Sequence, residues 1–425
     1  MKRKKALKFA CFAAAVILAA GAMGGIFLHF DGIEAELLET SVEPASWSQP
    51  SEEALDAAAD FSLQFFESCR TKEYVNSCVS PLSAYLALGL TANGADGDTL
   101  SQMETLLGGG EGTLPMVNET CRALMELLPM DESGGTIHLA NSIWFQDTGF
   151  EVMDGFLETN QAYYNAQLYR ADFSDKEQLA RDVSRWASNQ TDGLIEEFLE
   201  PDEISDLAQL MLLNATLFDV KWEEKIEKDQ VYDDTFRSYD GQEREVPFLH
   251  SDGDYLEEPG LYTGFRKRYE GSCVFVGLLP SGGRTPEELA AQLTPAQLRN
   301  LAGTRQGKAR GVFPKFRIEQ EISLDPGLRE MGLVKFFFKD GANFSRMFPS
   351  TANRYGVGAA DQAVFIDVNE NGTKAAAVTR IEMIGSAAVS AETSVLVELD
   401  RPFLYLILDT NTGLPLFMGA VNQLS

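Results

Sequence analysis

The sequence predicts an α+β fold with large sheets. Segments with helical periodicity come first, helices and strands are mixed in the middle of the chain, and strands close it. This order differs from the regular alternation of strands and helices that builds a parallel α/β sheet, and we find no internal repeat. At 425 residues the length suits two or three domains, although a large mixed fold of this length also forms a single domain.

The first 30 residues have the pattern of an export segment. MKRKK is followed by a run without charge from Phe9 to Leu28, with small residues around Ala22. The pattern predicts either a secretory signal cut near Ala22 or an uncleaved membrane anchor, since about twenty residues at about 1.5 Å each span a bilayer core of about 30 Å. Residues 31–51 are acidic and rich in Ser and Pro, which predicts a solvated linker. The remaining residues, 52–425, are predicted to form one domain outside the cell.

Helices are predicted at the start of this body. Ser51 is placed to cap a helix with an apolar face that includes Leu55 and Phe61. Ser80 and Pro81 open a second, apolar helix, and a turn at residues 94–97 leads into a third.

Strands are predicted further along. Residues 139–146 form one strand, and residues 210–222 form a nearly continuous apolar strand that we expect to be covered on both faces. Asn214, in the middle of that strand, then needs a hydrogen-bond partner. Residues 273–283 predict a buried strand and a turn, residues 312–324 one alternating strand, and residues 401–423 two strands joined by an Asn-Thr-Gly turn.

Composition excludes several classes of partner. The net charge of -29 disfavours nucleic acid, heparin-like polyanions and anionic membrane surfaces. No spacing of cysteines or histidines is typical of a metal site, and no motif predicts a cofactor. Apart from Cys11, the cysteines are scattered, which predicts buried free thiols with one or two disulfides as the alternative; they are Cys69, Cys78, Cys121 and Cys273.

The sequence does not predict an enzyme. A serine nucleophile needs a base, and the three histidines are His29 in the export segment, His138, and His250, which we place in a polar loop. Ser80 and Ser83 are therefore interpreted first as helix caps. A carboxylate pair of the kind that glycosidases use cannot be identified among the 64 acidic residues.

The stretch 363–386, AVFIDVNENGTKAAAVTRIEMIGS, contains a strand, a turn and a second segment that can also be a strand. In the first strand Val364, Ile366 and Val368 share one face. Beyond the turn, alternate residues divide into a charged side and an uncharged side. The uncharged side consists of Thr373, Ala375, Ala377, Thr379, Ile381, Met383 and Gly385. This segment is therefore compatible with a strand that buries one face.

Five motifs together resemble the serpins, the serine protease inhibitor family. They are SPLS at 80–83, LLNATLFDVKW at 212–222, FPKF at 313–316, VNENGTKAAA at 368–377 and RPF at 401–403. The resemblance covers about residues 52–425 and implies three β-sheets, about nine helices and an exposed reactive-centre loop at about residues 370–398. It also implies the family's mechanism, in which a protease cuts the loop as an acyl-enzyme and the loop then inserts into the main sheet and traps the protease.

The resemblance assigns roles to particular residues. The hinge of the loop comprises Glu370, Gly372, Thr373, Ala375, Ala376, Ala377 and Thr379. Lys315 matches the family lysine that anchors the hinge through Glu370. The region where the sheet opens matches Ser80, Ser83, Asn214 and Gln362. Gln362 stands where many serpins have His, so a pH response through that histidine is not expected.

The same resemblance places the reactive bond at Ser386–Ala387. The loop is somewhat long for the family, so Ala387–Ala388 is the alternative. Small residues at this bond predict elastase-like or subtilisin-like serine proteases as targets, with cysteine proteases open. A trypsin-like enzyme is expected to cut at Arg380 without being trapped. The alternative function is that of a non-inhibitory serpin that acts as a binding or structural protein.

Further expectations concern the molecule as a whole. We expect a monomer that is secreted or tethered to the outer face of the cell membrane. Five Asn-x-Ser/Thr sequons occur, at Asn118, Asn189, Asn214, Asn343 and Asn371. Glycans on Asn214 or Asn371 would conflict with folding or with loop insertion, so we expect both to be unmodified.

Overall fold

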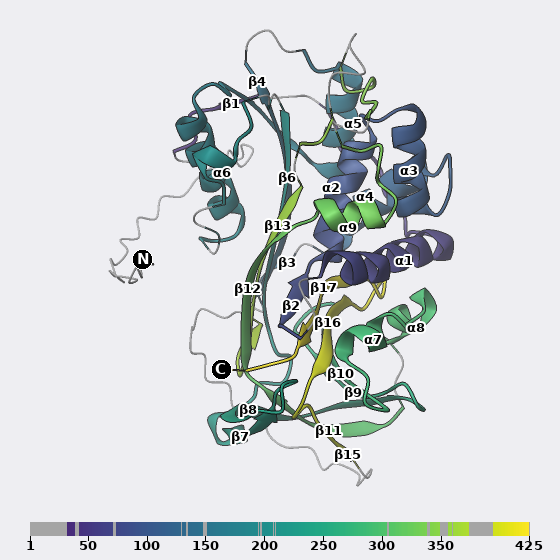
Figure 1. Cartoon of the computed structure of the whole chain (residues 1–425), viewed down its shortest axis with the longest axis vertical. Coiled ribbons are helices and arrows are strands. Elements are labelled where there is room, and N and C mark those ends of the chain that lie inside the picture. The colour runs from purple at the N-terminus through teal and green to yellow at the C-terminus, as the bar shows by residue number, and fades with distance from the viewer. Residues whose placement is uncertain are drawn as a thin grey trace, which may run out of the picture. The chain divides into compact units, whose positions relative to one another are not determined.

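The computed structural model of this protein has an α+β fold with three sheets, as predicted (Figure 1). It describes residues 32–38, 42–70, 74–128, 130–132, 135–147, 151–193, 195, 198–206, 208, 210–303, 306–337, 341–348, 356–358, 360–373 and 394–424. The predicted export segment lies outside these residues. Within them, no helix is both long enough and apolar enough to cross a membrane.

The described residues contain nine α-helices. They are α1 (Glu52–Cys69), α2 (Pro81–Ala92), α3 (Gly97–Gly108), α4 (Leu114–Leu127), α5 (Asp154–Tyr164), α6 (Lys176–Gln190), α7 (Pro286–Ala290), α8 (Pro295–Asn300) and α9 (Asp325–Glu330). Ser51 caps α1 as predicted, since its hydroxyl accepts a hydrogen bond from Ala54 N at 3.2 Å. Ser80 caps α2 in the same way, accepting from Ser83 N at 3.3 Å.

The main sheet has eight strands. In spatial order seven of them are β1 (Glu36–Leu37), β5 (Gln167–Ala171), β4 (Gly135–Gln146), β6 (Leu210–Lys221), β14 (Gly372–Thr373), β13 (Asp361–Asn369) and β12 (Phe316–Ser323), and the eighth, β3 (Met130–Glu132), pairs with β4. Helix α6 covers one face of this sheet, while α2 and α5 lie behind the other (Figure 1). Helices therefore lie on both sides of the main sheet.

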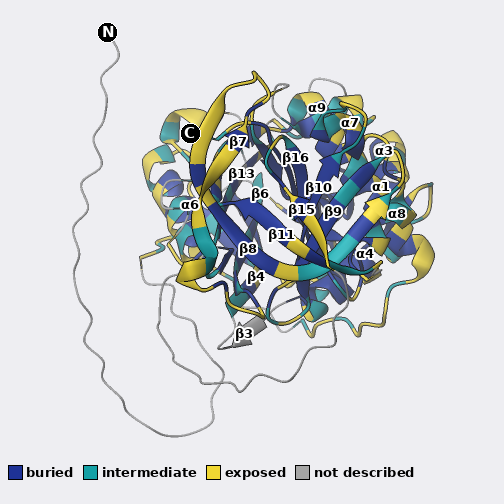
Figure 2. Ribbon diagram, turned by 90° about the horizontal axis from the view of Figure 1, so that it is seen from below, coloured by how far each residue is buried: buried dark blue, intermediate teal, exposed yellow. Residues whose placement is uncertain are grey.

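The other strands form a nine-stranded array that contains the two smaller sheets. In spatial order these strands are β15 (Val395–Glu398), β11 (Lys308–Pro314), β8 (Glu243–Glu258), β9 (Tyr262–Arg268), β10 (Cys273–Pro280), β16 (Phe403–Asp409), β17 (Pro415–Val421) and β2 (Ser77–Val79), with β7 (Val231–Arg237) beside β8. The first part of β8 pairs with β7 and its last part with β9, so β8 joins the two sheets. Strands β10 and β16 are mostly dark blue in Figure 2, whereas β7 is largely exposed.

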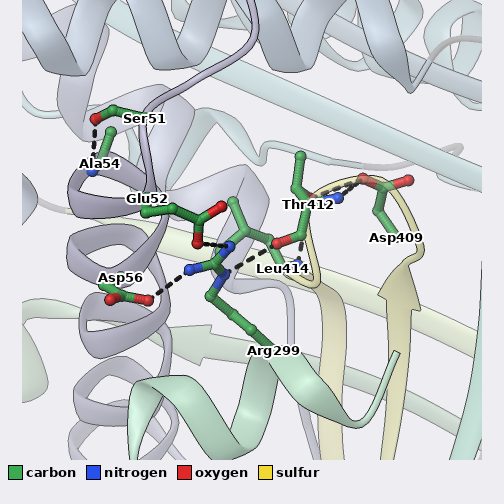
Figure 3. Close-up of polar contacts among 8 residues, drawn as sticks. All are labelled: Ser51, Glu52, Ala54, Asp56, Arg299, Asp409, Thr412 and Leu414. Carbon is green, nitrogen blue, oxygen red and sulfur yellow. Dashed lines mark hydrogen bonds and ion pairs between the residues drawn. The ribbon is translucent and has the colours of Figure 1, made fainter. Parts of the chain in front are cut away.

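Arg299 of α8 ties three parts of the fold together (Figure 3). Its guanidinium donates to the carboxylates of Glu52 at 2.8 Å and Asp56 at 2.5 Å on α1, and to Thr412 O at 3.2 Å in the predicted β16–β17 turn. Gly413 in that turn has φ of 75°, and a Cβ there would lie 2.8 Å from Arg299 Cα. The turn therefore needs glycine on both counts.

The predicted single strand at 312–324 is wrong, because the chain changes sheets there. Strand β11 ends at Pro314, and Lys315 N donates to Pro247 O at 2.8 Å. Strand β12 then starts at Phe316 in the main sheet. Pro314 cannot donate to a ladder, which suits the end of a strand. Lys315 therefore lies at the junction between two sheets.

The burial of His250 and of strand β6 also differs from the predictions. His250 is in strand β8 rather than in a polar loop, and it is buried with its ring stacked on Tyr232 at 3.8 Å between centroids. Strand β6 is not covered on both faces, since its first half, including Asn214, is only half-buried. That half of β6 borders a gap in the main sheet, between β6 and β13.

Part of the predicted solvated linker is bound to the fold. Strand β1 pairs with β5, and the Asp182 carboxylate on α6 accepts hydrogen bonds from Glu34 N at 3.0 Å and Ala35 N at 2.9 Å. Backbone pairing extends a sheet whatever the side chains are, which is why composition did not reveal it.

The four cysteines that the structure describes are free thiols and are buried. Burial raises the pKa of the Cys69, Cys78 and Cys121 thiols to about 12. These thiols stay protonated at neutral pH, which makes them poor nucleophiles.

Candidate functional site

The candidate site is a slot in the main sheet, between strands β6 and β13. The two-residue strand β14 fills only the end of the slot. Gly372 lies opposite Lys221 and Asn369, and Thr373 lies opposite Val220 and Val368. Beyond Thr373, the described residues of β6 and β13 do not pair with each other.

The slot contains a cavity of about 120 Å³. Its walls are residues of β6 and β13, with Ser83, Ala84 and Ala87 of α2 on one side and Trp186 and Ala187 of α6 on the other. Ser80, Ser83, Asn214, Gln362 and Thr373 all line this cavity. The structure thus brings together the four residues assigned to the sheet-opening region and one residue of the hinge.

Gln362 fastens the β13 wall to the start of α2. Its Oε1 accepts from Ser80 N and its Nε2 donates to Ser80 O, both at 2.9 Å. Ser80 Oγ donates to Leu416 O at 2.8 Å. The amide thus uses both its donor and its acceptor in a contact that does not titrate, since the amide carries no ionisable proton.

Asn214 fastens the β6 wall. Its Oδ1 accepts a short hydrogen bond from Ser83 Oγ, and its Nδ2 donates to Asn141 Oδ1 of β4 at 2.9 Å. Asn141 in turn donates to Tyr164 O at 2.9 Å. Asn214 therefore ties neighbouring strands together, as predicted from its polar side chain in an apolar strand.

The hinge strand is tightly fitted. Gly372 has φ of 150°, and a Cβ there would lie 2.2 Å from Val220 O, so only glycine fits. Thr373 is buried, and its hydroxyl hydrogen-bonds the phenol of Tyr269 at 2.5 Å. Burial raises the pKa of that phenol well above its usual value, so Tyr269 carries no charge at neutral pH.

Lys315 and Glu370 form an ion pair at the turn before the hinge. Both side chains are more than two-thirds buried. Burial acts to raise the pKa of Glu370, but the hydrogen bond from Lys315 and the neighbouring positive charges outweigh it and lower the pKa below its usual value of 4.5. The pair thus links the hinge turn to the junction between the sheets.

Trp222 is a hinge contact that the sequence did not predict. Its Nε1 donates to Asn369 O at 2.8 Å, and its backbone N donates to Asn371 O at 3.1 Å. Its ring stacks on Tyr269 at 4.3 Å between centroids. Trp222 ends the apolar run at 210–222, but that run gives no signal that links it to residues about 150 positions later.

The remaining predicted site residues lie outside the described residues, which stop at Thr373 and resume at Ser394. These are Ala375, Ala376, Ala377 and Thr379 of the hinge, Ser386 and Ala387 of the reactive bond, and the alternative Ala388. The loop was expected to reach about residue 398, but Val395–Glu398 form strand β15, which pairs with β11. The loop therefore ends before Val395.

The two histidines in the described part of the chain lie in different environments. His138 is exposed on β4, His250 is buried on β8, and no group of three or more His, Cys, Asp or Glu among these residues is arranged to hold a metal ion. The candidate functional site is therefore the slot in the main sheet, together with the hinge strand at its end.

Comparisons with known proteins agree with this geometry. A family model described as Serpin (serine protease inhibitor) matches residues 56–424. Neuroserpin of Mus musculus is 29% identical over 384 residues, which cover 86% of this chain and 90% of that protein. Serpin-ZXA of Oryza sativa subsp. japonica is 30% identical over 366 residues, which cover 81% of this chain and 89% of that protein.

Solved structures give the same result. The thermophilic serpin tengpin in its native state has a TM-score of 0.82 and 33% identity, with 92% of this chain and 100% of that chain covered. Native protease nexin-1 with heparin has a TM-score of 0.72 and 23% identity, with 88% of this chain and 99% of that chain covered. At that identity the second likeness shows the fold alone.

Proposed function

Because the chain belongs to the serpin family of serine protease inhibitors, we propose that it traps serine proteases as a suicide substrate and inserts its cut loop into the slot. One observation carries this proposal. The hinge strand β14 already lies between β6 and β13, at the end of a slot whose edges are unpaired further along. A cut loop that continued from Thr373 would satisfy both edges.

The register of β14 determines where each loop residue would go. Extended along β6, it places Ala375 opposite Phe218, Ala377 opposite Thr216 and Thr379 opposite Asn214. Extended along β13, it places the same three residues opposite Ile366, Val364 and Gln362. Thr373 and its β13 partner Val368 are buried, and so are Val364 and Ile366. On insertion in this register, the uncharged side of the loop would meet the core, while Lys374 and Arg380 would face outward.

Length also suits this insertion. The register places Met383 opposite Leu210, the first residue of β6, so the unpaired edge of that strand accepts residues up to Met383. Ser386, before the proposed reactive bond, lies three positions further. A protease attached there would be carried along the whole sheet, at about 3.3 Å per residue.

The proposed targets are elastase-like or subtilisin-like proteases, since Ser386 and Ala387 suit a shallow specificity pocket. Cutting at Arg380 would leave only seven residues after Thr373 in the inserted strand, so a trypsin-like enzyme is expected to use this chain as a substrate. The acidic composition disfavours heparin-like polyanions as partners. The pattern of residues 1–30 supports a location outside the cell.

The test is to incubate the full chain with an elastase-like, a subtilisin-like and a trypsin-like protease. Denaturing gels would show whether a covalent complex forms, and mass spectrometry would identify the released fragment. We expect a complex with the first two enzymes and a fragment that begins at Ala387 or Ala388. The matched control is the same protease with its catalytic serine blocked, which should give neither product.

A different result would overturn the proposal. Cleavage in the loop by every protease without any covalent complex would identify the chain as a non-inhibitory serpin. A fragment that begins far from residue 387 would overturn the assignment of the reactive bond alone.

A further inference from the structure

We propose that Lys267, a buried lysine in strand β9, is a positioning residue for the loop hinge and makes trapping depend on pH. This inference rests on the proposed function. It concerns a side chain that the inhibitory geometry described above does not use. Lys267 is 2% exposed, which is rare for lysine. Its ammonium lies over the ring of Trp222, the residue that hydrogen-bonds the hinge turn.

Lys267 has a complete set of contacts. Its Nζ donates to Glu224 O at 2.8 Å and to Ser251 Oγ at 2.7 Å, and it lies 5.5 Å from the centroid of the Trp222 ring. Glu224 is two residues after Trp222, so the ammonium holds the backbone of this segment as well as the ring. A cation over an indole face is attracted by the ring quadrupole, most strongly when it is desolvated.

Trp222 transmits this contact to the hinge. Its two N–H groups donate to the carbonyls of Asn369 and Asn371, which form the turn immediately before Gly372. The turn is the pivot about which the loop would fold into the slot. Lys267 thus holds Trp222, and Trp222 holds the pivot in the register that starts insertion at Thr373.

Three carboxylates lie near the Lys267 ammonium. Glu223 and Glu224 are in the segment after β6, and Asp252 is on β8; each of them acts to raise the pKa of Lys267. Phe275 on β10 and Phe313 on β11 pack against the Trp222 ring and do not titrate. Burial outweighs the three carboxylates and lowers the pKa of Lys267 to about 8. The cation over Trp222 is therefore lost within a mildly alkaline range, although the amine can still hydrogen-bond.

The first test is spectroscopic and needs no protease. We expect Trp emission of the full chain to titrate with a midpoint near pH 8. The titrating component should be absent from Lys267→Met, which removes the charge, and from Trp222→Phe, which removes the reporter. Lys225→Met, at an exposed lysine paired with Glu227, should titrate like the parent chain. If the titration is absent from the parent chain, the proposal is overturned.

The second test measures how many inhibitor molecules are consumed for each protease trapped, at pH 7 and pH 9. Lys267→Met should raise this number by up to about thirtyfold at pH 7, the factor expected for the loss of one desolvated cation–aromatic contact. At pH 9 the parent chain should consume nearly as many inhibitor molecules per trapped protease as Lys267→Met does. Lys267→Arg stays charged, so it should consume as few at both pH values as the parent chain does at pH 7. Comparison at the same pH cancels the protease's own pH dependence.

The outcomes separate this proposal from the proposed function. If no protease forms a complex, the proposed function fails, while the fluorescence titration still tests the Lys267–Trp222 contact. If Lys267→Met loses the titration yet traps protease as efficiently as the parent at both pH values, the positioning role is wrong. If Lys267→Arg behaves like Lys267→Met, a purely structural role for the lysine replaces the charge-dependent one.

Discussion

Gln362 and Ser80 are joined by two reciprocal hydrogen bonds across the floor of the slot. The Gln362 amide accepts from Ser80 N and donates to Ser80 O, both at 2.9 Å, and both residues are buried. The pair connects β13 to the cap of α2, so it fixes one wall of the slot to the helix beneath it.

Gln362→Ala should lower the free energy of unfolding by about 1–3 kcal/mol, because the buried Ser80 N loses its hydrogen-bond partner. Ser80 O keeps the hydrogen bond that it accepts from Ala84 N at 3.2 Å. Urea unfolding followed by circular dichroism measures the change. The matched control is Gln242→Ala, at an exposed glutamine, which should shift stability by less than about 0.5 kcal/mol. Equal losses in the two variants would contradict the structural role of Gln362.

Ala377→Arg should convert the inhibitor into a substrate. The register places Ala377 opposite Val364 and Thr216, where an unpaired Arg would be buried on insertion at a cost of several kcal/mol. The fraction of protease in covalent complex on denaturing gels measures the effect. Ala376→Arg is the control, because the neighbouring position faces outward and should still trap. Equal trapping by both variants would show that the assigned register is wrong.

The Lys315–Glu370 pair should stabilise the hinge in a pH-dependent way. Because the folded state lowers the pKa of Glu370, its contribution is present above the usual pKa of 4.5 and is lost as the pH falls below it. Lys315→Ala should lower stability by about 1 kcal/mol at pH 7 and by less at pH 4. Thermal unfolding at the two pH values measures this difference, with Lys225→Ala as the exposed control. A loss that is equal at both pH values would contradict the ionic role.

Glycosylation should follow burial. Asn118 is 7% exposed, and its amide exchanges hydrogen bonds with Asn93 and accepts one from the Tyr164 hydroxyl at 2.7 Å. Asn189, at the end of α6, is exposed. Expression in a glycosylating host followed by peptide mass spectrometry should find a glycan on Asn189 and none on Asn118 or Asn214. Occupancy of Asn118 or Asn214 in active protein would refute this prediction.

Sequence reasoning predicted those parts of the site that depend on local pattern. Alternation predicted that Val364, Ile366 and Val368 share a buried face, and all three are buried. The lone polar Asn214 predicted a hydrogen-bonded tie between strands, and the structure shows that tie to Asn141. Trp222 and Lys267 could not be assigned in this way, because their contacts come from segments distant in the sequence.

Sequence reasoning failed where partners outside the segment decide its conformation. The alternation of residues 312–324 is compatible with one strand. Lys315 N still hydrogen-bonds Pro247 O of β8, yet the next residue, Phe316, enters a second sheet. The acidic linker resembles a solvated segment in composition, but Asp182 and the edge of β5 bind its backbone. In both cases backbone hydrogen bonds, which composition does not encode, set the outcome.

By itself, the sequence determined the α+β class, the family resemblance and the chemistry of the hinge: a glycine, a run of small residues and an uncharged side that can enter a core. Only the tertiary structure decided that Gly372 and Thr373 already lie in the main sheet at the end of an open slot. It also decided that Trp222 hydrogen-bonds the turn before them and that Lys267 contacts the Trp222 ring. The physical reason is that periodicity records which face of a segment is apolar, whereas sheet neighbours and buried polar contacts depend on how distant segments meet.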